Sequence, residues 1–117
     1  MKESIIRQKT FALALRIVKL HKYLAQEKHE FVMSKQLLRS GTGVGALVRE
    51  AQNAESKADF IHKMSIALKE ANETEYWIEL LYKSGYLDAN TYSKIHSEAL
   101  SVLRMLISIV KTSKSNL

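Results

Sequence analysis

The chain contains no cysteine, no proline and only four glycines among its 117 residues. Without cysteine, disulfide bonds and thiol chemistry are excluded, and nothing indicates an oxidising compartment. Proline breaks helix interiors and is common in loops, so its absence favours long helices with short connections. No window approaches the roughly 18 apolar residues of a membrane span, and the N-terminus lacks the features of a signal peptide. We therefore expect a cytoplasmic protein without a membrane partner.

Length and composition predict one folded domain over residues 1–117. A hydrophobic content of 46% and a charged content of 26% are typical of globular proteins, and no repeat or linker indicates a second domain. The net charge of +6 is unevenly placed: residues 1–49 carry ten Lys and Arg against three Glu, and residues 50–90 carry four against eight. A folded bundle of this chain could therefore have a basic and an acidic side.

Apolar residues recur at spacings of three and four along four segments, which is the period of amphipathic helices. The pattern predicts helices at about 4–26, 35–52, 57–84 and 89–112. The expected buried stripes are Ile6, Leu13, Ile17, Leu20 and Leu24; Leu37, Gly41, Val44, Val48 and Ala51; Phe60, Met64, Ala67, Ala71, Thr74, Ile78 and Leu81; and Tyr92, Ile95, Ala99, Val102, Leu106 and Ile109. Four such helices with short connections predict an all-α, antiparallel up-down-up-down four-helix bundle.

Capping residues define the expected helix ends. Ser34 is the expected N-cap of the second helix and Asp88 that of the fourth. Ser56 and Asp59 resemble a capping box at the start of the third helix. Gly85 suits the left-handed position just past that helix, and the polar tail from Lys111 onward is expected to fray.

Three of the four glycines lie inside the second predicted helix, where each costs about 1 kcal/mol relative to alanine. Gly41 and Gly45 lie on or beside the apolar stripe, so we expect them to allow close helix packing. Gly43 points away, and either meets a second neighbour or weakens the helix; a loop at 40–45 is the alternative. The Gly-Thr-Gly-Val-Gly run fits neither a phosphate-binding loop nor a dinucleotide-binding motif.

No catalytic constellation is visible, and we predict no catalytic residue, no metal ligand and no cofactor. A di-iron bundle needs a Glu-x-x-His motif on each of two helices, whereas the chain has only Asp59 before His62. Glu75 continues an apolar line, and a buried carboxylate there would need a partner, which Arg49 or Lys69 could supply. We expect structural hydrogen bonding rather than acid–base chemistry at Glu75.

The first helix carries a basic stripe formed by Lys2, Lys9, Arg16 and Lys19, with Lys22 and Tyr23 close by. Phosphate backbones bind Lys and Arg through counterion release and need no fixed motif. We therefore predict that Lys9, Arg16, Lys19 and Lys22 contact RNA or DNA. A charged outer face that only keeps the bundle soluble is the alternative.

The fourth helix has a second apolar stripe beside the first, formed by His96, Leu100, Leu103, Ile107 and Val110. Together the two stripes exceed the band of about 100° that a bundle helix buries. We expect Leu100, Leu103, Ile107 and Val110 to contact another copy of the chain. The alternative function is an interaction scaffold that binds a different protein partner through this face.

Residues 39–81 resemble the bacterial four-helix-bundle family of proteins encoded by intervening sequences of large-subunit ribosomal RNA genes. The similarity is strongest at Val44-Gly45-Ala46, Arg49-Glu50-Ala51, Ser56 to Phe60, Ile66 to Ala71 and Glu73 to Trp77. That family is similar to the accessory variability protein of diversity-generating retroelements, which is basic, pentameric and binds nucleic acid and a reverse transcriptase. The resemblance implies a homopentamer, a nucleic-acid-related role and no established enzyme activity. Leu47 stands where the family pattern usually has asparagine.

Overall fold

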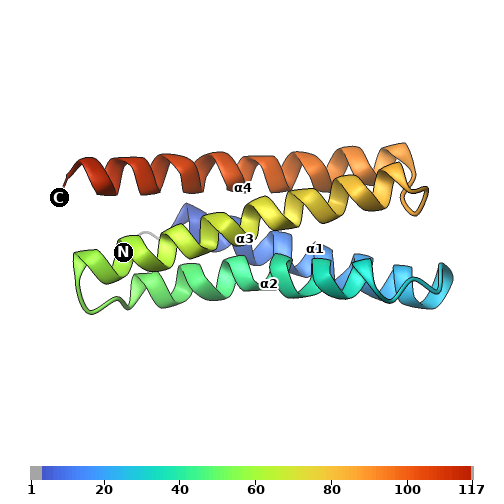
Figure 1. The fold of residues 1–117 in the computed structure, drawn as a ribbon, viewed down its shortest axis with the longest axis horizontal. Coiled ribbons are helices and arrows are strands. Elements are labelled where there is room, and N and C mark those ends of the chain that lie inside the picture. Colours follow the sequence, from blue (N-terminus) through green and yellow to red (C-terminus); the bar gives the residue numbers. More distant parts are fainter. Residues whose placement is uncertain (1–3, 117) are drawn as a thin grey trace.

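The computed structural model describes residues 4–116, which form four long helices. These are α1 (Ile5–Glu27), α2 (Met33–Gln52), α3 (Lys57–Lys83) and α4 (Ala89–Ser115). They run alternately up and down, so α1 starts and α4 ends at the same end of a bundle measuring 46 × 26 × 19 Å (Figure 1). Neighbouring helices pack along the bundle, and α1 and α4 make the sparsest contact of the four pairs. The predicted all-α four-helix bundle is confirmed.

The apolar stripes form one core at the centre of the bundle. In α1, the five predicted residues from Ile6 to Leu24 are all at most 7% exposed. Three ends of the predicted stripes differ, and one of them is Tyr92, which is only partly buried against the core. Ile61 is buried whereas Phe60 is only partly buried, and Val110 is buried whereas Ile109 packs at the edge of the core. Since Val110 lies four residues after the fully buried Leu106, it extends the inner stripe rather than the outer one.

Glycine brings α1 and α2 close together. A Cβ on Gly41 would overlap the side chain of Ile17, and a Cβ on Gly45 would lie 3.4 Å from the backbone oxygen of Thr10. Gly43 faces Glu70 of α3, and a Cβ there would meet it at 3.9 Å. Helix α2 continues through all three positions, so the alternative of a loop at 40–45 is not observed.

The start of α2 differs from the prediction, because Glu30 rather than Ser34 caps the helix. The Glu30 carboxylate accepts the backbone N–H groups of Val32, Met33 and Ser34 at 3.1, 3.1 and 2.7 Å. His29 adopts a left-handed conformation, φ 53°, which turns the chain between the helices. Ser34 lies buried inside the first turn, where its hydroxyl donates to the Glu30 carbonyl oxygen at 2.8 Å.

The other helix ends follow the predicted chemistry more closely. Ser56 accepts from the Asp59 N–H at 3.1 Å, Asp88 accepts from the Thr91 N–H at 2.7 Å, and Gly85 has a φ of 91°. Asp59 departs from a true capping box, because its carboxylate accepts from the Glu55 N–H rather than from that of Ser56. The tail does not fray at Lys111, since α4 continues to Ser115.

Within the described part of the chain, no helix combines the length and the hydropathy needed to cross a lipid bilayer.

Candidate nucleic-acid interface between α1 and α4

The seam between α1 and α4 is hollow because small and charged side chains line it. Near the α1 N-terminal half, a hollow of about 340 Å³ is lined by Lys9, Ala12, Ser97, Glu98, Ser101 and Val102. Alanine and serine side chains are too short to fill the space between two helices, and lysine directs its charged end toward water. The α1–α4 seam therefore stays open along this stretch.

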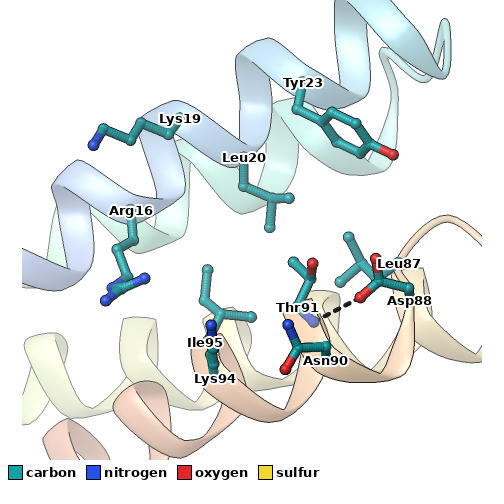
Figure 2. Close-up of a pocket in the computed structure, with 10 residues that line it drawn as sticks. All are labelled: Arg16, Lys19, Leu20, Tyr23, Leu87, Asp88, Asn90, Thr91, Lys94 and Ile95. Carbon is teal, nitrogen blue, oxygen red and sulfur yellow. Dashed lines mark hydrogen bonds between the residues drawn. The ribbon is translucent and has the colours of Figure 1, made fainter.

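A larger cavity of about 370 Å³ opens further along the same seam. It is lined by Arg16, Lys19, Leu20, Tyr23, Leu87, Asp88, Asn90, Thr91, Lys94 and Ile95. In Figure 2, Leu20 of α1 and Ile95 of α4 point toward each other across the gap, and Arg16 extends from α1 toward α4. Leu20, Leu87 and Ile95 are buried and form an apolar floor, while the three cations lie at exposed positions. We call this cavity, with its ten lining residues, the α1–α4 groove.

Heptad spacing aligns the α1 residues with the seam. Lys9, Arg16 and Tyr23 are separated by seven residues each, which is almost two turns of helix and about 10 Å of rise. They therefore occupy nearly the same side of α1. Lys19 lies one turn from both Arg16 and Tyr23, so it joins the same face.

The three cations of the groove differ in whether they form an ion pair with a carboxylate. Arg16 Nε lies 2.5 Å from Glu98 Oε1 of α4. Lys19 and Lys94 form no hydrogen bond or ion pair with any other residue of 4–116, so their charges face solvent. The one carboxylate of the groove, Asp88, is engaged at the start of α4. The Thr91 N–H lowers the pKa of Asp88, and the charge of Lys28 contributes to the same shift.

The structure brings most of the predicted basic residues to this seam. Arg16 and Lys19 line the groove, and Lys9 lines the smaller hollow, where its Nζ donates to Ser101 Oγ at 3.4 Å. Lys22 is exposed but is not a lining residue of either. Lys2 lies outside the described residues. Lys94 was missed from sequence because it belongs to another helix and shows no basic stripe of its own.

The predicted apolar interface on α4 is only partly at the surface. Val110 is 7% exposed and Leu103 packs against the core, whereas Ile107 is 48% exposed. A second apolar surface on α1 was not predicted: Phe11 and Leu15 are each about half exposed and border a hollow of about 400 Å³ with Gly45 and Ala46 of α2.

Polar pairs also link α3 to its neighbours, and they differ from the expected ones. Glu75 pairs with His96 of α4 at 2.9 Å rather than with Arg49 or Lys69. Arg49 instead lies over the Phe11 ring, 4.9 Å from its centroid, and Lys69 is exposed. Glu75, Glu79 and His96 together form the one group in the described residues whose donor atoms lie close enough to share a metal ion.

Fold and surface together define a basic four-helix-bundle protein with an open seam between its first and last helices. The chain matches the family model described as 23S rRNA-intervening sequence protein over residues 2–108, and it belongs to that family. It is also similar to a crystal structure of a protein of unknown function from the S23 ribosomal protein family of Bacteroides thetaiotaomicron. The two share 52% sequence identity with a TM-score of 0.90, over 92% of this chain and 99% of the other. No curated protein matches the chain significantly.

Proposed function

We propose that the protein is a non-enzymatic, homo-oligomeric four-helix bundle that binds nucleic acid, RNA or DNA, through the α1–α4 groove. The observation that carries the proposal is the gathering of Arg16, Lys19 and Lys94 from two helices around one cavity. Lys19 and Lys94 have no partner within residues 4–116, and the groove's own carboxylate is engaged by the α4 N-terminus. Such cations can neutralise phosphates directly, and the counterions that then leave the nucleic acid drive binding.

The remaining groove residues suit a single strand. Tyr23 is 43% exposed and presents a ring at the groove, and exposed aromatic rings stack on unpaired bases with little regard to sequence. Asn90 and Thr91 add neutral hydrogen-bonding groups. The matching family is described by an intervening sequence of 23S rRNA, so RNA is the first ligand to test. We also place the function in the cytoplasm.

The test measures binding of a fluorescent single-stranded RNA oligonucleotide by anisotropy at several salt concentrations. We expect the variant Arg16→Gln, Lys19→Gln, Lys94→Gln to bind at least about tenfold more weakly. It should also lower the magnitude of the slope of log K against log [salt] by about 2, because each lost phosphate contact on a single strand removes about 0.7.

A matched control removes three positive charges away from the groove. It replaces the exposed Lys35, Lys69 and Lys111 with Gln. Each variant has a net charge of +3 instead of +6, so a general charge effect weakens both equally. Equal losses, or an unchanged slope in the groove variant, would refute the groove as the binding site.

Self-association is the second part of the proposal. Ile107 on α4 and Phe11 and Leu15 on α1 are large apolar side chains about half exposed. Exposed apolar side chains gathered on a helix surface are typical of protein–protein contacts, and the family resemblance implies a pentamer. The second candidate function, a scaffold for a different protein partner, rests on the exposed Ile107 of α4.

A further inference from the structure

A cluster of metal-binding side chain types lies between α3 and α4, separate from the lining of the α1–α4 groove. Glu75 and Glu79 are four residues apart, so they lie on the same face of α3, and His96 faces them from α4. One donor atom from each of the three lies within 4.8 Å of the others. His96 Nε2 and Glu75 Oε2 are 2.9 Å apart.

No lysine or arginine among residues 4–116 forms an ion pair with this cluster. Its one hydrogen bond is between Glu75 and His96, and Glu79 forms no hydrogen bond or ion pair within residues 4–116. Two carboxylates therefore act on one small region, where a cation would be stabilised.

Aromatic stacking holds the imidazole in place. The rings of Tyr82 and Tyr92 stack with centroids 4.0 Å apart, and Tyr92 stacks on His96 at 4.8 Å. These contacts restrict rotation of the His96 ring. Because His96 and Glu75 are each about a quarter exposed, water can reach the cluster, and a bound ion would keep a position open to solvent.

We propose that Glu75, Glu79 and His96 bind one divalent transition-metal ion, for which Zn²⁺ is the best fit. Zn²⁺ accepts one imidazole nitrogen and carboxylate oxygens at about 2.0–2.2 Å with a water molecule completing the site. Mg²⁺ and Ca²⁺ prefer oxygen ligands alone, so the imidazole selects against them. Zn²⁺ binds His96 through Nε2, so the ring keeps a single proton, on Nδ1, and any second proton of a charged imidazole passes to solvent.

The experiment is a calorimetric titration of the full chain with ZnCl₂ after removal of metals by a chelator. We expect one saturable site per chain and a rise in melting temperature with Zn²⁺. Glu79→Gln should weaken binding at least about tenfold, since even losing a group that only orients a metal ligand costs 10–100-fold. Glu79 is exposed and has no hydrogen-bond or ion-pair partner in the described part of the chain, so this change leaves the helix packing intact.

Matched controls separate this site from incidental binding to surface side chains. Glu50→Gln removes one exposed carboxylate on α2, and His62→Gln removes one exposed histidine on α3; both should leave Zn²⁺ affinity unchanged. Titration with Co²⁺ should give a visible absorption band that His96→Gln abolishes. The proposal is wrong if no saturable binding occurs, if Glu79→Gln and His96→Gln bind normally, or if His62→Gln abolishes binding. The RNA titration does not involve these residues, so the two proposals can fail independently.

Discussion

At the scale of single residues, the distance between α1 and α2 depends on positions where a side chain is missing. Gly41 lies against the fully buried Ile17, and Gly45 lies against the α1 backbone at Thr10. Interiors are packed as densely as organic crystals, so an added methyl group has nowhere to go without displacing a neighbour. Gly43, on the same helix, has ordinary space beside Glu70.

These differences predict opposite effects of one substitution at two positions. We expect Gly41→Ala to lower the free energy of unfolding by up to about 2 kcal/mol, because overpacking costs about 1–3 kcal/mol and the gain in helix propensity recovers about 1. Gly43→Ala should raise it by up to about 1 kcal/mol, because it gains helix propensity without a clash. Urea denaturation measures both. A Gly41→Ala variant that is stabilised as much as Gly43→Ala would mean that α1 and α2 do not pack closely there.

At the scale of elements, each helix begins at a side chain that satisfies its first N–H groups. Ser4, Ser56 and Asp88 cap α1, α3 and α4 from their N-cap positions, whereas α2 uses Glu30 from the preceding turn. The α4 cap also lies in the α1–α4 groove, so the start of α4 and the shape of the groove depend on the same residue.

The Asp88 cap predicts a dependence of stability on acid pH. The Thr91 N–H lowers the pKa of Asp88 below its usual 3.8, so the folded state binds this proton less readily than the unfolded state. Its stabilising contribution is complete above about pH 4 and is lost as the pH falls through the lowered pKa. Asparagine still caps the helix but does not titrate. We therefore expect the melting temperature of Asp88→Asn to fall less between pH 5 and pH 2 than that of the native protein. Equal losses in the two proteins would contradict this role.

At the scale of the whole molecule, the surface combines a basic groove with exposed apolar side chains on α1 and α4. Avidity multiplies modest contacts when several copies of a binding surface act on one strand. A ring of bundles would repeat the α1–α4 groove in each copy, and this would raise affinity for a polyanion without any new residue.

Assembly is tested by light scattering. We expect a mass of about five times the 13.3 kDa of one chain, and we expect Ile107→Glu to lower it, because a charge on a half-exposed apolar contact has to be desolvated. Ser93→Glu introduces the same charge at an exposed position on α4 and should leave the mass unchanged. A native protein that stays monomeric at high concentration would exclude self-association.

The sequence alone determined the four helices, their buried stripes and the close approach at Gly41 and Gly45. These features follow from local periodicity and from the chemistry of neighbouring residues, which do not depend on how the helices assemble. The caps at Ser56 and Asp88 were predictable for the same reason. Glu30 was not, because its carboxylate reaches α2 only through the left-handed turn at His29.

Only the tertiary structure decided which side chains from different helices meet. The α1–α4 groove joins Arg16 and Lys19 to Lys94, and the α3–α4 cluster joins Glu75 to His96 rather than to Arg49. It also assigned Val110 to the core and left Ile107 outside. Helical periodicity specifies which face of a helix is buried but not the rotation and register of its neighbour, and it is that register which sets the partners of each polar side chain.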